Sequence, residues 1–509
     1  MKWSVLCLAA GLVSACGFAP LDLWPLTLAG VAVLLWSIEE APRLRAALSR
    51  GWWFGLGQFT VGLNWIATAF SYQSNMPAWL GWVAVVLLSL YLAVYPAVAA
   101  GLAWRWGRGD RLRLVLVFAA AWIVTEFLRG VMFTGFPWNP LGASLLLTPA
   151  AFFSTLAGTY GLGGLAALIA GALYLLARRQ WRAGAGVTFG IVALAGLALA
   201  AAPSPDGPAG PAVRIVQPNI DQRIKYDPDH FERQWRLLEE LSHPFAGAPP
   251  PNGPRLVLWP EVAIPEAISI DEPARMRIAR LLRAGDVMLT GASEVVLGED
   301  RRVIAIYNSV FAVDAASAIN GRYDKAHLVP YGEYLPMRPL LSAIGLSELA
   351  PSRFDTWEGP GPRSLDVPGF GRIGMQICYE IVFSGAVVDR ANRPTFLFNP
   401  SNDAWFGRWG PPQHLAQARL RAIEEGLPVL RSTPTGISAI IDARGNLAAS
   451  LGWRERGVID GQVPPAAPPT VFARTGNLAP FLFALLLIAA AIASARLQSR
   501  AKPVREVRT

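Results

Sequence analysis

Residues 373–380 read Ile-Gly-Met-Gln-Ile-Cys-Tyr-Glu, which places Cys378 directly after a short apolar run. Three other runs in residues 203–477 have the same form, with a few aliphatic or β-branched residues followed by polar and turn residues. They lead into Gln217, Glu261 and Asn399. Helix-like stretches, such as 275–283 and 414–425, lie between such runs. This alternation predicts an α/β layered domain, a fold class that usually carries its chemistry at the carboxyl ends of strands.

Outside this domain the chain is strongly apolar. Hydrophobic residues make up 53% of the sequence and charged residues 16%, whereas a soluble globular protein carries about 25% charged residues. A membrane-spanning helix needs about 20 apolar residues, so we predict an α-helical polytopic bundle of about eight transmembrane helices. The expected spans are 3–17, 22–38, 54–70, 79–104, 114–133, 151–177, 186–202 and 478–495. The expected domains are a membrane domain (1–202, about seven helices), an extracytoplasmic domain (203–477), and a last span with a basic tail (478–509).

Basic residues follow one side of these spans. Eleven Lys and Arg residues occupy the N-terminus and one set of alternating loops, whereas the opposite loops 18–22, 71–78 and 134–150 contain none. The positive-inside rule therefore predicts cytoplasmic termini and a domain 203–477 outside the cytoplasm. The net charge of +9 lies largely in these loops and in the tail, so we do not predict nucleic-acid binding.

Two features of the apolar region allow alternative interpretations. Val13 to Cys16 has the form of a lipoprotein processing site, but a single Lys2 precedes it and another span follows, so we favour an uncleaved helix. Glu126 and Arg129 lie three residues apart in the fifth span, on one helical face. We favour an internal ion pair that stabilises the bundle over a contact with lipid headgroups.

Cys378 is the only cysteine of the α/β domain. Only a few per cent of an ordinary thiol is thiolate at pH 7, so a nucleophilic Cys378 needs a base or a nearby cation. One possibility is a Cys–His dyad. The other uses Glu261, if burial raises its pKa, as the base and Lys325 to stabilise an oxyanion. The candidate histidines are His230, His243, His327 and His414.

The local contexts of these residues resemble a known family. Glu261 stands in Leu-Trp-Pro-Glu, Lys325 in Asp-Lys-Ala-His-Leu-Val-Pro-Tyr-Gly-Glu-Tyr, and Cys378 in Ile-Cys-Tyr-Glu. This order resembles the catalytic triad of the nitrilase superfamily, whose fold is an αββα sandwich. The flanking spans and the segment 401–407 resemble the membrane-embedded branch, the apolipoprotein N-acyltransferases of bacterial inner membranes.

The resemblance implies a two-step acyl transfer in lipoprotein biosynthesis. Cys378 would take an acyl chain from a phospholipid, with phosphatidylethanolamine the usual donor, as a thioester. The α-amino group of diacylglyceryl-cysteine on an apolipoprotein would then accept it. Glu261 would be the general base and Lys325 would stabilise the oxyanion. The resemblance also implies supporting active-site roles for Glu333, Tyr379, Glu380 and Tyr226, the last replacing the usual Trp. We predict no metal, because no His/Cys cluster has the spacing of metal ligands, and no cofactor.

The sequence allows two other functions and leaves the role of one segment undecided. A membrane-tethered amidase would use the same triad with water as the final acceptor. A non-enzymatic scaffold is disfavoured because Glu261, Lys325 and Cys378 are all present. The apolar segment 337–349 is interpreted either as an arm that contacts lipid or covers the site, or as a core helix.

Overall fold

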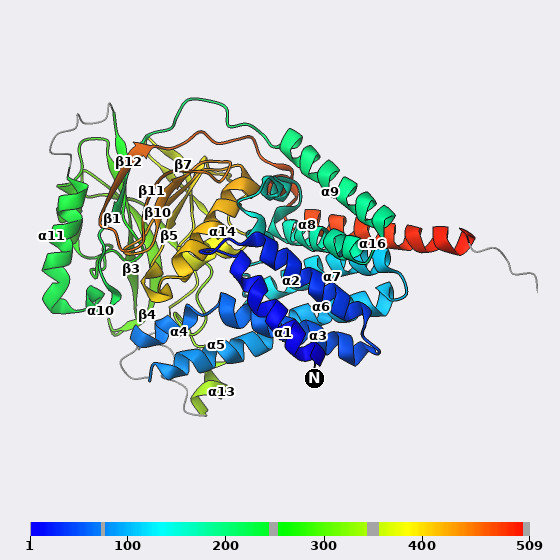
Figure 1. Ribbon diagram of the computed structural model, residues 1–509. Helices are drawn as coiled ribbons and strands as arrows, with labels where there is room; N and C mark the ends of the chain where they lie inside the picture. Colours follow the sequence, from blue (N-terminus) through cyan, green and yellow to red (C-terminus); the bar gives the residue numbers. More distant parts are fainter. Residues whose placement is uncertain (1, 73–76, 244–252, 344–355, 502–509) are drawn as a thin grey trace, which may run out of the picture. The chain divides into compact units, whose positions relative to one another are not determined.

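The computed structural model describes residues 2–72, 77–243, 253–343 and 356–501. The chain forms two compact units. The helical unit comprises Met1–Ala67, Trp79–Ala202 and Val471–Thr509, and the α/β unit comprises Thr68–Ala78 and Pro203–Thr470. Figure 1 shows the helices of the first unit and the two sheets of the second.

The helical unit is built from long apolar helices. Among the residues that the structure describes, five helical stretches are long and apolar enough to cross a membrane, and two shorter apolar helices lie near the N-terminus. Leucine-, valine- and alanine-rich sequences of this length satisfy all their backbone hydrogen bonds internally, which is the requirement for a membrane span. The main helices are α1 (Lys2–Ser14), α2 (Trp24–Glu39), α3 (Leu44–Gly62), α5 (Trp79–Leu92), α6 (Val94–Gly107), α7 (Arg111–Val131), α8 (Ser154–Ala177), α9 (Trp181–Ala201) and α16 (Leu478–Ala501).

We expected a span at 54–70, but helix α3 runs from Leu44 to Gly62, so it begins ten residues earlier and ends eight residues earlier than the apolar pattern placed it. Its first half contains the buried side chain of Arg50, which donates from Nη1 to the main-chain oxygen of Ser37 and lies 4.6 Å from the Trp3 ring centroid. These partners stabilise the buried charge of Arg50. Helix α3 can therefore include this residue, which the apolar pattern had placed in a loop before the span. A short helix, α4 (Ile66–Ala69), follows the break.

The α/β unit contains two six-stranded sheets. The first has the order β12-β1-β2-β3-β4-β5 and the second the order β11-β10-β9-β8-β7-β6. Each has three parallel central strands with antiparallel strands at both sides. The strands are β1 (Ala212–Gln217), β2 (Arg255–Leu258), β3 (Val287–Leu297), β4 (Val303–Asp314), β5 (Ile319–Asp324), β6 (Ser364–Val367), β7 (Gly371–Met375), β8 (Phe396–Pro400), β9 (Val429–Ser432), β10 (Ser438–Ile441), β11 (Leu447–Leu451) and β12 (Gly457–Gln462).

The two sheets pack face to face. Alternate residues of each strand point to opposite faces, so Leu256 and Leu258 of β2 enter the core between the sheets, whereas Val257 faces the helices. Helices α11 (Phe231–Ser242) and α12 (Glu272–Ala279) cover the first sheet, and α14 (Gly410–Glu425) packs beside β9 of the second (Figure 1). The αββα sandwich confirms the predicted fold class, together with the apolar helices.

A cross-sheet contact fixes the strand ends. Ser432 Oγ, at the end of β9, lies within hydrogen-bond distance of the main-chain oxygens of Val216 and Leu258 in the other sheet. Buried hydrogen bonds of this kind hold one relative position of the sheets, because shifting them would leave buried polar groups without partners. The carboxyl ends of β1, β2 and β9 therefore lie together.

The segment 337–349 is described only in part. Arg338–Ala343 forms the short helix α13, Met337 is exposed, and residues 344–349 lie outside the described residues. The interpretation of this segment as an arm stays a prediction.

Candidate active site

Cys378 occupies a tight turn at the end of β7. It begins the one-turn helix Cys378–Val382, and its φ of +52° lies in the left-handed region that non-glycine residues rarely adopt. The side chain is 5% exposed. A strained turn that the surrounding structure maintains is a common feature of active sites, and it presents this thiol at the carboxyl ends of the parallel strands.

Glu261 reaches the same place from the first sheet. It follows β2 by three residues, and its Oε1 accepts a hydrogen bond of 2.7 Å from Asn308 Nδ2 on β4. The carboxylate and the Cys378 thiol lie close enough for each to shift the pKa of the other. The carboxyl group is thus in position to take the thiol proton directly.

Lys325 completes the group. It follows β5, is 1% exposed, and its Nζ lies 3.3 Å from Glu261 Oε1 and 2.9 Å from Glu333 Oε1. Asn308 Nδ2 also donates to Glu333 Oε1, at 2.9 Å. Two carboxylates, one ammonium and one amide therefore form a connected network beside Cys378, which brings together the three residues predicted as a triad.

Burial and the charges of this network shift the pKa values of its ionisable groups. Burial and the Glu261 carboxylate raise the pKa of the Cys378 thiol well above its usual value, so the resting thiol is protonated. Burial also acts to raise the pKa of Glu261, but Lys325, Lys225 and the Asn308 hydrogen bond outweigh it and leave that pKa below its ordinary value. Glu261 was considered as the base on the condition that burial raises its pKa. That condition is not met, because two buried ammonium groups that the sequence did not reveal lie near this carboxylate.

Glu380 connects the turn of Cys378 with the segment of Lys325. Its Oε2 accepts from the main-chain N–H of Ile377 at 2.6 Å, and its Oε1 accepts from Tyr323 Oη at 2.8 Å and from the N–H of Ala326 at 2.7 Å. Burial raises the pKa of Glu380 to about 7 despite these hydrogen bonds. These hydrogen bonds position the segments of Cys378 and Lys325, which belong to different sheets, relative to each other.

The other supporting residues differ in their surroundings. Glu333 is anchored by the main-chain N–H of Val329, which donates to its Oε2 at 2.7 Å. Tyr379 is buried and packs edge-on against Phe383, with ring centroids 5.1 Å apart. Tyr226 is 57% exposed, so it can offer an aromatic surface to a ligand.

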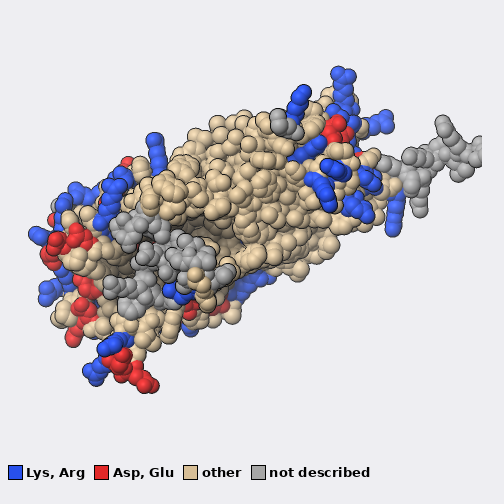
Figure 2. All heavy atoms as spheres, turned by 90° about the horizontal axis from the view of Figure 1, so that it is seen from below, with Lys and Arg blue, Asp and Glu red and all other residues tan. Residues whose placement is uncertain are grey.

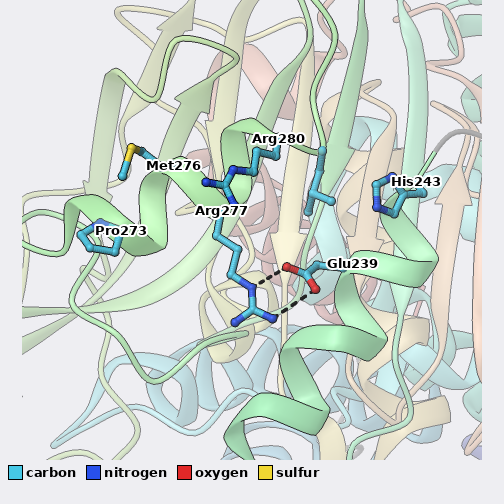
Figure 3. Close-up of a pocket in the computed structure, with 7 residues that line it drawn as sticks. Glu239, His243, Pro273, Met276, Arg277 and Arg280 are labelled. Atoms are coloured by element: carbon cyan, nitrogen blue, oxygen red, sulfur yellow. Dashed lines mark hydrogen bonds and ion pairs between the residues drawn. The ribbon is translucent and has the colours of Figure 1, made fainter.

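The histidines do not form a dyad with the thiol in the described part of the chain. His414 is fully buried, and its Nε2 lies 3.1 Å from the main-chain oxygen of Cys378. The His327 ring packs against the tilted ring of Phe383, with ring centroids 3.8 Å apart, and His230 forms a hydrogen bond with Asp227. His243 is exposed and lines a hollow of about 580 Å³ beside the paired Arg277 and Glu239 (Figure 3).

Two functional candidates escaped the sequence analysis, and a third, His414, lies in a different arrangement from the dyad that was considered. Asn308 lies in the middle of β4, Lys225 ends the short helix α10 (Gln222–Lys225), and His414 belongs to a buried group with Asp403 and Arg431. Only the histidine had drawn attention, as a dyad candidate. Within the described ranges, no group of three or more His, Cys, Asp or Glu side chains is arranged to hold a metal ion.

The predicted ion pair of the helical unit is present. Arg129 Nη2 lies 3.6 Å from Glu126 Oε1, and both side chains are buried. Arg129 Nη1 also donates to the main-chain oxygens of Phe136 and Trp138, each at 2.8 Å, while Glu126 accepts from the N–H of Leu141 at 2.8 Å. These bonds to the loop backbone favour the structural interpretation.

Comparisons with known proteins cover both units. Residues 10–172 match the family model of the apolipoprotein N-acyltransferase N-terminal domain, and residues 212–467 match that of carbon-nitrogen hydrolases. The chain is 36% identical to an apolipoprotein N-acyltransferase of Rhodopseudomonas palustris, with 96% of this chain and 94% of the relative covered. It has the same identity and coverage with one of Bradyrhizobium diazoefficiens.

Solved structures of the nitrilase superfamily are similar to part of the chain. Nit3 of Saccharomyces cerevisiae has a TM-score of 0.36 at 16% identity and covers 60% of this chain and 100% of its own. An amidase from Nesterenkonia has a TM-score of 0.34 at 14% identity, with 51% and 93% covered.

Proposed function

Because the chain belongs to the apolipoprotein N-acyltransferase family, we propose that it transfers an acyl chain from a phospholipid to the N-terminal α-amino group of a diacylated apolipoprotein. The observation that carries the chemistry is the buried group of Glu261, Lys325 and Cys378, in which Glu261 Oε1 lies 3.3 Å from Lys325 Nζ and the Glu261 carboxylate raises the pKa of the nearby thiol. The donor that we propose is phosphatidylethanolamine, and the acceptor is diacylglyceryl-cysteine.

The first step forms a thioester. As the sulfur of Cys378 attacks the ester carbonyl, its proton passes to Glu261, and the carbonyl oxygen becomes an oxyanion beside the Lys325 ammonium. The carbon–oxygen bond of the ester then breaks, and the leaving lysophospholipid oxygen takes the proton from Glu261. Proton transfer accompanies the attack because the low pKa of Glu261 and the raised pKa of the thiol disfavour a free thiolate in the resting site.

The second step forms the amide product and regenerates the free thiol of Cys378. The neutral α-amine of the acceptor attacks the thioester carbonyl, Glu261 accepts the amine proton, and Lys325 again stabilises the oxyanion. The carbon–sulfur bond breaks, the amide forms, and the Cys378 sulfur recovers its proton from Glu261. A hydrolase would differ only in using water here. We do not favour that alternative, because the N-terminal family match and the relatives are N-acyltransferases rather than amidases.

The apolar helices of the helical unit support the assignment of the chain as a bacterial membrane protein. We propose the inner membrane, with 1–202 and 478–509 as the membrane-associated parts, 203–477 on the periplasmic side and both termini in the cytoplasm. Arg178 pairs with Glu39 and Glu40, and Arg111 pairs with Glu39, so loops far apart in sequence share one end of the helical unit. Figure 2 shows Lys and Arg gathered at one end of this unit beside an uncharged surface, as the positive-inside rule requires of a cytoplasmic end.

The direct test uses purified full-length protein, phosphatidylethanolamine and a synthetic diacylglyceryl lipopeptide. We expect triacylated peptide from the native protein and none from a Cys378→Ser variant. A second peptide with a blocked α-amine is the control acceptor. Free fatty acid as the main product with both peptides would instead identify a hydrolase and contradict the proposal.

A further inference from the structure

Lys225 is a buried ammonium group close to the proposed general base. It is 6% exposed, and its Nζ donates to the main-chain oxygen of Glu261 at 3.0 Å. Among the described residues, no carboxylate oxygen lies within 4.0 Å of this nitrogen. A lysine ammonium carries three N–H donors, and burying it without a paired carboxylate is costly. A residue kept in this state needs a reason other than a salt bridge.

The peptide that Lys225 contacts belongs to a strained turn. Val262, the residue after Glu261, has a φ of +44°, an unusual conformation for a β-branched residue. Gly291 on β3 packs directly against this turn: a Cβ there would lie 2.5 Å from the nitrogen of Val262. The N–H of Ala263 donates to the oxygen of Gly291 at 2.8 Å. Strain of this kind persists only where surrounding groups hold it.

Lys225 is itself held from behind. Gln234 of α11 donates from Nε2 to the main-chain oxygens of Ile224 and Lys225, at 2.7 Å and 3.3 Å. The end of α10 is therefore fixed relative to the first sheet. A fixed lysine can act on the Glu261 turn as a rigid support instead of following its movements.

Two ammonium groups face Glu261 from different elements. Lys325 approaches the carboxylate from the end of β5, and Lys225 approaches the main chain from α10. The other groups around this carboxyl are Asn308, Glu333, Tyr226 and the Cys378 thiol. Burial lowers the pKa of Lys225 to about 8, with partial compensation from Glu261 and Cys378. Lys225 is thus mostly cationic at neutral pH.

We propose that Lys225 is a positioning residue of the active site, which holds the strained Glu261 turn through its main-chain hydrogen bond and helps to keep the Glu261 carboxylate ionised. The proposal rests on the proposed role of Glu261 as a base. Neither effect requires contact with the substrate. The hydrogen bond and the charge are separable, because a glutamine keeps a donor without the charge.

The test follows the alkylation of Cys378 by iodoacetamide against pH, in the full-length protein and by peptide mass spectrometry. This reagent needs no lipid and reports on proton transfer from the thiol to Glu261. The variants are Lys225→Met, Lys225→Gln and, as the matched control, Arg223→Met, which removes an exposed charge from the same helix. Thioester formation from phospholipid is measured in parallel.

The Lys225→Met variant should form the thioester about 100-fold more slowly, the scale expected for a displaced catalytic group. As the pH is lowered, alkylation of this variant should begin to decline at a higher pH than alkylation of the native protein. Loss of a positive charge raises the pKa of Glu261, and the protonated acid cannot take the thiol proton. Lys225→Gln should recover at least tenfold in thioester formation but keep the shifted pH dependence. Arg223→Met should match the native protein in both measurements.

An unshifted pH profile in Lys225→Met, or a Lys225→Gln variant no faster than Lys225→Met, would overturn the proposal. If Lys225→Met does not fold, as judged by its thermal melting, the comparison of Lys225→Gln with Arg223→Met decides the charge effect alone. If the native protein forms no thioester, the proposed function fails, whereas the alkylation profiles still test Lys225.

Discussion

His414 Nε2 lies 3.1 Å from the main-chain oxygen of Cys378. Since that oxygen can only accept, the imidazole must donate, which fixes a proton on Nε2. The other ring nitrogen, Nδ1, lies 2.8 Å from Asp403 Oδ1 and 3.0 Å from Arg431 Nη2. A fully buried group of three side chains therefore supports the strained turn of the proposed nucleophile through a hydrogen bond to its main chain.

Replacing His414 tests this support. His414→Ala removes a donor from a buried carbonyl, and we expect a loss of about 1–3 kcal/mol in the free energy of unfolding, with slower thioester formation. His414→Gln can keep a donor and should restore part of both. Thermal melting and the rate of thioester formation measure the two effects. A His414→Ala protein with native acylation would show that the turn needs no such support.

Glu380 offers a second test of positioning. Its two oxygens accept from main-chain N–H groups on both sides of the site, and a Glu380→Gln amide would place an N–H against one of them. We expect the variant to melt at a lower temperature and to acylate Cys378 at least tenfold more slowly, since a buried N–H that faces another N–H loses its partner at a cost of about 1–3 kcal/mol. The control is the exposed Glu299→Gln, which should leave both properties unchanged.

Lys325→Met tests the origin of the low pKa of Glu261. In the native protein that pKa lies below its ordinary value of 4.5, so alkylation of Cys378 should decline only below about that pH. Removing the Lys325 charge raises the pKa, and the decline should then begin at a higher pH. Thioester formation should fall by about 10²–10³-fold as well, as on loss of an oxyanion-stabilising donor. Equal pH profiles in the two proteins would rule out this electrostatic origin.

An Arg129 variant tests whether the ion pair of the helical unit has a structural or a catalytic role. Arg129→Met removes the donors that Phe136 and Trp138 accept from and leaves Glu126 buried without its cation. We expect a lower melting temperature in detergent and an unchanged pH profile of Cys378 alkylation. A shifted profile in a variant that melts normally would assign the pair a direct role in catalysis.

Accessibility labelling tests the proposed topology. A cysteine introduced by Glu299→Cys, between β3 and β4, should react with a membrane-impermeant maleimide in cells whose outer membrane has been permeabilised. One introduced by Arg179→Cys, between α8 and α9, should react only after lysis. The reverse pattern would place residues 203–477 in the cytoplasm and exclude an enzyme that acts on exported lipoproteins.

The α/β alternation of the sequence predicted a layered domain with polar residues at strand ends, and the resemblance to the nitrilase superfamily predicted the αββα sandwich and the grouping of Glu261, Lys325 and Cys378. Asn308 could not be found in this way, since only the pairing of β3, β4 and β5 brings a mid-strand residue to the site. Lys225 and His414 contact main-chain oxygens that no side-chain motif reveals. Arg50 escaped for a related reason: the partners that allow its burial are a remote carbonyl and an aromatic ring.

The central claim is that Cys378 carries the acyl chain between donor and acceptor. The most direct measurement is the intact mass of the full-length protein after incubation with phosphatidylethanolamine, with peptide mapping of the modified residue. We predict an added mass of one acyl chain on Cys378, lost when a diacylglyceryl lipopeptide is supplied and retained in buffer alone. Acylated lipopeptide made at the native rate by a Cys378→Ala protein would contradict the account.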